Sequence, residues 1–282
     1  IVEAAMGLSI ANIKSIVEMQ FADFVSSGFN PIVNYLAKSH YRWGQNADIV
    51  IRMPCGGGVG AGPFHSQTNE AWFTKTPGLK VVYPAFPFDA KGLLATSIND
   101  PNPVLFFEHK ALYRSIRQEV PTDYYTLLIG KASVVRTGEA ITIVSYGAGV
   151  HWALETLNEN PDISADLIDL RTLQPLDIET VYKSVKKTGR VVLASDSVER
   201  GSCLHNIAAN ITNLCFDELD APPVVVGAKN WISPAAEMET DYFPQASWII
   251  DAIHERVVPL PGHVVEHNYT NGELQRIARL GV

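Results

Sequence analysis

Residues 80–107 read KVVYPAFPFDAKGLLATSINDPNPVLFF, and this stretch decides the fold class. Two short runs rich in β-branched and aromatic residues, Lys80–Tyr83 and Pro103–Phe107, enclose a helical pattern at Asp89–Ile98, for which Asp89 is the predicted N-cap. A strand, a helix and a second strand in this order predict a βαβ unit with parallel strands.

The same alternation extends over most of the chain. In the first half we also expect strands at Ile16–Phe21 and Asp48–Met53 and a helix at Phe29–Lys38. A second series follows a polar stretch at 114–123, with strands at Ile141–Tyr146, Ala165–Leu170, Val191–Ser195 and Val224–Val226, and helices at Val150–Asn158, Ile178–Lys187 and Ser202–Leu214. Two such series predict two α/β domains, each a mostly parallel sheet flanked by helices. We place the domains at 1–125 and 126–258, followed by a C-terminal arm at 259–282 with a short helix at Asn271–Leu280.

Composition narrows the class of protein. The 282 residues are 46% hydrophobic and 18% charged, which is typical of a globular protein. A net charge of −8 argues against nucleic acid as the main partner. Cys55, Cys203 and Cys215 form no CxxC pair, which favours free thiols in a reducing compartment. No apolar run approaches the roughly 18–20 residues that cross a bilayer, so we expect no membrane segment.

The segment 56–67, GGGVGAGPFHSQ, is the strongest candidate for a ligand-binding loop. It contains five glycines, which let a backbone approach a ligand closely, and it ends at His65 between small and polar residues. The pattern G-x-G-x-x-A is formally present, but a dinucleotide loop must open a helix, and here Pro63 follows. His65 is our candidate active-site residue. A purely structural glycine turn and a structural histidine are the alternatives.

Other polar residues allow two interpretations each. Glu3 and Glu18 are flanked by apolar residues, which favours either a raised pKa suited to proton exchange or a position at a strand end facing water. The residues Ser97, Asp100 and Asn102 could hold a hard cation at the end of a helix, or they could form an ordinary turn. The other histidines have no spacing typical of metal ligands, so a catalytic zinc is not expected.

Several collinear segments resemble one known family. They are IVEAAMGL, IVEMQFADF, HSQTNEAWF, PGLKVVYPAFPFDAKGLL, VLFFEHKALYR, IDLRTLQPLD and SVKKTGR, and they span residues 1 to about 258. The chain resembles the beta subunit of the thiamine-diphosphate-dependent decarboxylating component of 2-oxo acid dehydrogenases, of the branched-chain or pyruvate type. The resemblance implies a transketolase-like pyrimidine-binding domain followed by a transketolase C-terminal domain. It also implies oxidative decarboxylation of a 2-oxo acid with acyl transfer to lipoyl.

The resemblance assigns roles to individual residues. Glu3 falls at the family's glutamate that hydrogen-bonds the cofactor's aminopyrimidine, Phe24 at the aromatic residue that stacks on it, and Ile1 and Gln20 along the same pocket. His65 matches the histidine near the reacting carbon. The backbone oxygens of four positions match a potassium site, at Ile49, Ser97, Asp100 and Asn102.

The same resemblance implies partners. The motif that holds magnesium and diphosphate is absent from the sequence, and in this family it belongs to an alpha subunit or domain. The chain also begins later than a complete beta subunit, and its tail resembles bacterial fused alpha–beta versions. We therefore expect an alpha part, a lipoyl acyltransferase core, a homodimer of beta parts and a bacterial cytoplasmic location. The alternatives are a fragment of a transketolase or deoxyxylulose-phosphate synthase, and a non-catalytic assembly subunit.

Overall fold

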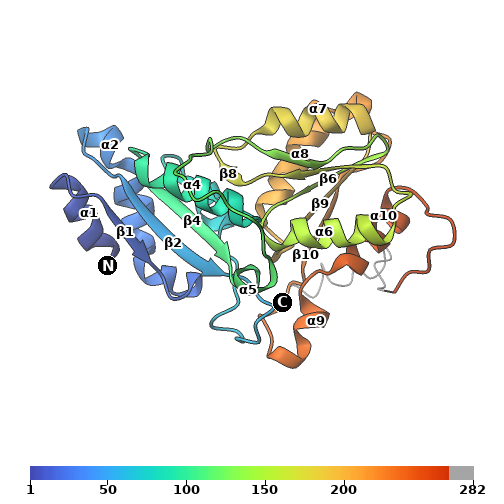
Figure 1. Cartoon of the computed structure of the whole chain (residues 1–282), viewed down its shortest axis with the longest axis horizontal. Coiled ribbons are helices and arrows are strands. Elements are labelled where there is room, and N and C mark those ends of the chain that lie inside the picture. The colour runs from blue at the N-terminus through green and yellow to red at the C-terminus, as the bar shows by residue number, and fades with distance from the viewer. Residues whose placement is uncertain (267–282) are drawn as a thin grey trace. The chain divides into compact units, whose positions relative to one another are not determined.

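The computed structural model describes residues 1–266 and divides the chain into two compact units. The first consists of Ile1–Lys131 with Arg171–Leu176, and the second of Ala132–Leu170 with the described residues from Asp177 onward. Each unit has its own five-stranded sheet with helices against it, which confirms the predicted fold class (Figure 1). The helix expected at Asn271–Leu280 lies outside the described residues.

The sheet of the first unit has the strand order β1-β2-β4-β3-β8. Its strands are β1 (Ser15–Glu18), β2 (Ile49–Cys55), β3 (Lys80–Val82), β4 (Val104–His109) and β8 (Thr172–Gln174). The first four run parallel, and β8 is antiparallel to β3. Every residue of the central strand β4 is buried, as expected where helices cover both faces of a parallel sheet.

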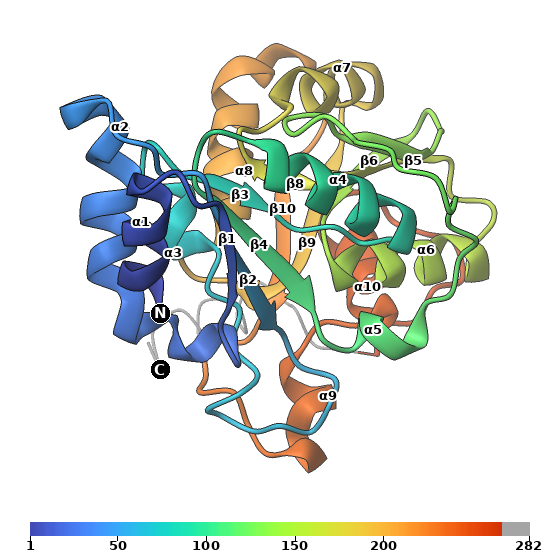
Figure 2. The ribbon, with the colours of Figure 1, turned by 60° about the vertical axis from the view of Figure 1, so that its left-hand side comes forward.

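Helices lie on both sides of this sheet (Figure 2). They are α1 (Val2–Ile10), the 3₁₀ turn η1 (Ala22–Gly28), the π-helical turn η2 (Pro31–Leu36), α2 (Ala37–Trp43), α3 (Ala71–Thr74), α4 (Pro87–Asn99) and α5 (Leu112–Ser115). One side of the core joins α4 to the sheet through Val50, Val82, Leu93, Val104 and Phe106. Packing of this kind holds β2 and β4 in place, and the candidate site lies at their carboxyl ends.

The predicted N-cap of α4 was wrong. Phe86 holds the cap position and Pro87 is the first helical residue, a place that proline tolerates because no intrahelical partner is needed there. Asp89 instead lies buried in the first turn, where its carboxylate pairs with Arg171 at 2.7 Å. Burial raises the pKa of the Asp89 carboxyl above its usual value, and the Arg171 guanidinium only partly offsets this.

The sheet of the second unit has the order β10-β9-β6-β7-β5. Its strands are β5 (Ser133–Arg136), β6 (Ile141–Ser145), β7 (Ala165–Asp169), β9 (Val191–Val198) and β10 (Val224–Ala228). Its helical segments are α6 (Ala148–Glu159), α7 (Ile178–Thr188), α8 (Cys203–Leu214), η3 (Phe216–Glu218), η4 (Ala236–Met238), α9 (Glu239–Tyr242) and α10 (Ala246–Arg256). Four strands run parallel and β5 is an antiparallel edge.

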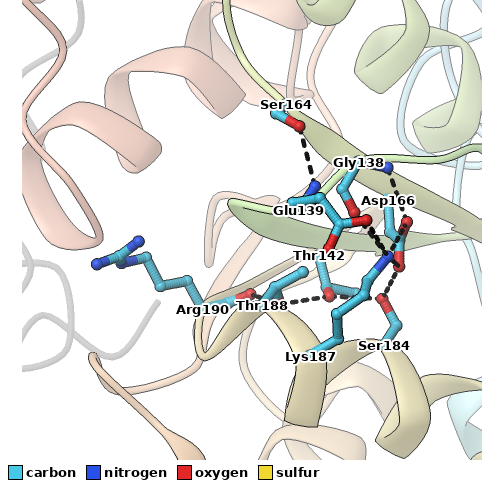
Figure 3. A network of polar contacts seen from close by, with 9 residues as sticks. All are labelled: Gly138, Glu139, Thr142, Ser164, Asp166, Ser184, Lys187, Thr188 and Arg190. Atoms are coloured by element: carbon cyan, nitrogen blue, oxygen red, sulfur yellow. Dashed lines mark hydrogen bonds and ion pairs between the residues drawn. The ribbon is translucent and has the colours of Figure 1, made fainter.

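A buried polar network ties β6, β7 and α7 together (Figure 3). The carboxylate of Asp166 accepts hydrogen bonds from Ser184 Oγ at 2.5 Å, Lys187 Nζ at 2.9 Å and the Gly138 amide at 2.9 Å. The hydroxyl of Thr142 lies 2.7 Å from that of Ser184 and extends the network into β6. The second unit is therefore held together by this hydrogen-bond network as well as by its apolar core.

The C-terminal part of the described chain is attached to α10. His263 Nε2 lies 2.6 Å from Asp251 Oδ1, and the amide of Glu266 donates to Asp251 Oδ2 at 3.1 Å. Asp251 is fully buried. In residues 1–266, no helix combines the length and the apolar character needed to cross a bilayer.

Candidate active site

The glycine loop leaves the sheet at the end of β2. Cys55 is the last residue of the strand, and the amide of Gly56 donates to the Gln67 carbonyl at 3.2 Å, which closes the base of the loop. Gly58 has a φ of 76°, and a Cβ there would meet the Cβ of Ala111 at 3.3 Å. Any other residue at Gly58 would therefore be strained and crowded, so the loop needs glycine at this position.

His65 lies at the far end of this loop between two aromatic rings. The imidazole is half-buried and contacts Phe21 and Phe24 edge-on, with ring centroids 5.5 Å and 5.6 Å away. Phe24 is 46% exposed, so part of its ring remains open to a planar ligand. The structure therefore brings together two of the predicted site residues, His65 and Phe24, from segments about 40 positions apart in the sequence.

An open groove of about 620 Å³ lies beside the loop. Gly58, Val59 and Ala61 of the loop form one part of its lining, and Lys110 and Arg114 form another. A second hollow of about 520 Å³ shares Tyr113 with this groove, but its lining includes Arg52 and none of the glycine-loop residues. We place the candidate site at the first groove, since Phe21, which contacts His65, also lines it.

Glu18 belongs to a different network, centred on Arg52. The guanidinium forms a bidentate ion pair with Glu108, in which Nε lies 2.6 Å from Oε1 and a second nitrogen lies 2.7 Å from Oε2. It also pairs with the carboxylate of Glu18 at 2.6 Å. The Tyr113 hydroxyl also donates to Glu108. The hydrogen bond to Glu108 raises the pKa of Arg52. The pKa of Tyr113 is also raised, mainly by burial and secondly by its hydrogen bond to Glu108. Glu18 is exposed and ion-paired, which agrees with the water-facing interpretation.

Glu3, Ile1 and Gln20 are all exposed in this chain. Val2 and Ala5 lie on the buried face of α1, and Glu3 lies in the first turn on the exposed face. Among residues 1–266 the side chain of Glu3 has no hydrogen-bond or ion-pair partner. Glu3 could therefore hydrogen-bond a cofactor only if a second subunit covers this face. The assignment of Glu3, Ile1 and Gln20 to a cofactor pocket stays a prediction.

The four residues predicted to bind potassium occupy the ends of β2 and α4. Ile49 begins β2, and Ser97 Oγ donates to the Leu93 carbonyl at 2.7 Å within α4. Asp100 Oδ1 accepts from the side chain of Asn102 at 2.8 Å, and its other oxygen pairs with Lys80. Burial raises the pKa of Asp100, but the bonds from Lys80 and Asn102 outweigh this and hold it below its usual value.

An ammonium group also reaches this cluster. Lys14 Nζ lies 2.5 Å from the Ile98 carbonyl oxygen and 3.3 Å from that of Asp100. Two backbone oxygens at the end of α4 thus accept hydrogen bonds from the Lys14 ammonium, and the potassium site stays a prediction. In the described part of the chain no three His, Cys, Asp or Glu side chains are grouped to hold a metal.

Sequence reasoning missed three residues of the site: Phe21, Asp23 and Lys110. Phe21 contacts His65, and the carboxylate of Asp23 accepts a hydrogen bond from the backbone N–H of Gln67 at 3.1 Å. The Lys110 ammonium donates to the His65 carbonyl. The available signal was the position of Lys110 directly after β4, since ligand sites of parallel sheets form at the carboxyl ends of the strands.

Comparison with known proteins identifies the class of both units. Residues 1–115 match the family described as "Transketolase, pyrimidine binding domain", and residues 130–249 match "Transketolase, C-terminal domain". A solved structure titled "Split gene transketolase, inactive beta4 tetramer" superposes with a TM-score of 0.72, covering 90% of this chain and 79% of that chain. At 23% identity, that likeness shows the fold alone. The chain is therefore transketolase-like in both units.

Two curated relatives narrow the family. The "2-oxoisovalerate dehydrogenase subunit beta" of Bacillus subtilis (strain 168) is 46% identical over 221 residues, covering 77% of this chain and 68% of that subunit. The "Pyruvate dehydrogenase E1 component subunit beta" of the same organism is 38% identical over 251 residues, covering 88% of this chain and 77% of that subunit. The chain belongs to the family of beta subunits of the thiamine-diphosphate-dependent decarboxylating (E1) components of 2-oxo acid dehydrogenases. Such subunits work with alpha subunits in multienzyme complexes.

Proposed function

We propose that the chain supplies the aminopyrimidine-binding half of a thiamine diphosphate site in an enzyme that decarboxylates 2-oxoisovalerate, a related branched-chain 2-oxo acid, or pyruvate. The observation that carries the proposal is the pair formed by His65 and the half-exposed Phe24 beside the glycine loop. An open aromatic face suits stacking on a planar heterocycle, and an imidazole at its edge suits proton transfer at a nearby substrate atom.

The cofactor, when bound, supplies the electron sink that decarboxylation requires. The contribution of this chain is to bind and orient. Phe24 would hold the pyrimidine ring, Glu3 would hydrogen-bond it once a neighbouring subunit covers α1, and Ile1 and Gln20 would line the pocket. His65 would donate or accept a proton beside the substrate and assist acyl transfer to lipoyl.

The surface of the first unit supports the proposal that a partner covers the first 43 residues. Among residues 1–266, 23 large apolar side chains are exposed, and ten of these belong to residues 1–43, among them Ile13, Tyr41 and Trp43. So many exposed apolar side chains in one part of the chain favour a protein interface there. We propose that an alpha part carrying the magnesium ligands and a second beta part cover this region, that a lipoyl acyltransferase core receives the acyl group, and that the complex works in the bacterial cytoplasm.

The test is to express the chain together with its alpha part and measure thiamine-diphosphate-dependent decarboxylation of 2-oxoisovalerate, pyruvate and 2-oxoglutarate. We expect activity with one of the first two substrates, little turnover by the isolated chain, and a loss of about 10²-fold or more in His65→Ala. Glu3→Gln should lose a similar factor, whereas Glu179→Gln, an exposed carboxylate in the first turn of α7, should lose nothing.

Each alternative predicts a different result. A non-catalytic assembly subunit predicts full activity in His65→Ala and in Phe24→Ala. A fragment of a transketolase predicts turnover of sugar phosphates and none of 2-oxo acids. Near-wild-type decarboxylation by Glu3→Gln in an otherwise active complex would remove Glu3 from the site and leave the role of His65 to be judged by its own variant.

A further inference from the structure

The loop that carries His65 is built from the ends of two adjacent strands. β2 and β4 are parallel neighbours, and Cys55 lies opposite His109 in their register. The glycine loop begins directly after Cys55, and Lys110 follows directly after His109. The Lys110 amide donates to the Cys55 carbonyl at 3.0 Å, so the start of the loop and the base of the lysine side chain share one fixed point of the sheet.

From this point the Lys110 side chain reaches the other end of the loop. Lys110 is only 8% exposed, and its ammonium donates to the backbone carbonyl of His65. The same ammonium lies 4.8 Å from the centre of the Phe21 ring, which contacts the His65 imidazole. A buried ammonium is costly unless its contacts compensate for the lost water. Here those contacts include the backbone of His65 and one of the two rings beside its imidazole.

A carboxylate holds the next part of the loop. Asp23 is 9% exposed, and its Oδ1 accepts from the Gln67 amide at 3.1 Å. Asp23 lies in η1, the turn that also carries Phe24. The carbonyl of His65 and the amide of Gln67 are therefore both held by charged side chains, with only Ser66 between them. These two contacts restrain the backbone on which the imidazole stands.

We propose that Lys110 and Asp23 are positioning residues for His65: together they fix the loop so that the imidazole stays between Phe21 and Phe24. The proposal rests on the proposed function, because the position of His65 affects the reaction only if His65 takes part in it. The ammonium and the carboxylate touch the loop backbone, so they act through His65. A displacement of about 1 Å at a reacting group costs on the order of 10²-fold in rate.

The test compares Lys110→Met, which keeps the length and removes the charge, with Lys110→Arg, which keeps the charge and the donors. Lys75→Met, an exposed lysine at the end of α3, is the control. In the isolated chain we expect Lys110→Met to speed hydrogen exchange of the amides of residues 57–67, with Lys110→Arg closer to wild type. In the complete complex we expect kcat to fall about 10- to 100-fold with little change in KM, and Lys110→Arg to recover part of it.

Unchanged exchange and unchanged kcat in Lys110→Met would overturn the proposal, as would faster exchange together with full kcat. Asp23→Asn provides a second route if Lys110→Met fails to fold, with the same expectation for exchange of the loop amides. The proposed function fails separately, by full activity of His65→Ala. In that case the exchange measurement alone decides whether the two charged side chains hold the loop.

Discussion

Replacing Asp166 by asparagine should destabilise the second unit by about 2–3 kcal/mol. Breaking a fully buried ion pair costs about 3–5 kcal/mol, and the side chain of Lys187 is 36% exposed, which screens the interaction and lowers the figure. The change also removes charge from the acceptor of the Ser184 and Gly138 hydrogen bonds. Glu139→Gln is the matched control, because Glu139 lies 3.6 Å from the same ammonium but is 77% exposed. We expect it to cost less than about 0.5 kcal/mol.

The loss should depend on pH in a defined direction. Burial by itself raises the pKa of Asp166, but the hydrogen bonds from Lys187, Ser184 and the Gly138 amide outweigh it, so the pKa in the folded protein is lowered. A carboxyl with a lowered folded pKa stabilises the protein above its unfolded pKa of about 3.9, and this contribution is lost as pH falls through the folded pKa. The gap between wild type and Asp166→Asn should therefore hold from pH 7 to about pH 5 and close in acid.

Urea unfolding followed by tryptophan fluorescence measures this gap. Trp43 and Trp72 belong to the first unit and both are exposed, so a Trp43→Phe, Trp72→Phe background restricts the signal to the second unit, where Trp248 is fully buried. The reasoning is refuted if Asp166→Asn costs no more than Glu139→Gln, or if the gap between wild type and Asp166→Asn is as large below pH 3 as at pH 7.

Two further substitutions test buried polar pairs elsewhere. Arg171→Met should cost the first unit about 3 kcal/mol at pH 7, because the carboxylate of Asp89 stays buried without its partner. Since the folded pKa of Asp89 is already raised, that penalty should shrink as urea titrations move from pH 7 toward pH 5, and an equal loss at both pH values would contradict this. His263→Ala should cost the second unit about 2–3 kcal/mol by leaving one oxygen of buried Asp251 without its imidazole partner. In urea titrations the same substitution should cost much less in an Asp251→Asn background, and equal losses in both backgrounds would contradict the pairing.

The predicted strands and helices follow from burial on both faces of a parallel sheet. Runs such as Ile141–Ser145 are buried throughout, and each predicted helix of the second unit lies within two residues of the structure at either end. The helix α10 was missed because seven of its eleven residues are buried, so it shows no alternation between apolar and polar faces. The short strand β8 was missed because it pairs with Val81 and Val82, far away in the sequence, and local patterns do not report such pairing.

The site was only partly predictable for the same reason. The glycine loop and His65 are one continuous segment, so composition alone identified them. The contact of Lys110 with His65 joins positions 45 residues apart, and that of Asp23 with Gln67 joins positions 44 apart. Neither follows from local sequence, because each depends on which strands become neighbours in the sheet.

The sequence nevertheless contains a general clue at the end of β4. The run Val104–Phe107 is entirely apolar, and it is followed directly by Glu108, His109 and Lys110, each at most 8% exposed. Burying three ionisable side chains in succession is unfavourable for packing alone, so a strand that passes directly from apolar to ionisable residues points to an edge of the sheet with another purpose. Here that edge holds the Arg52 network on Glu108 and the His65 loop on Lys110. The same transition at the carboxyl end of a central parallel strand therefore predicts a functional edge of the sheet, whether or not a glycine motif is also present.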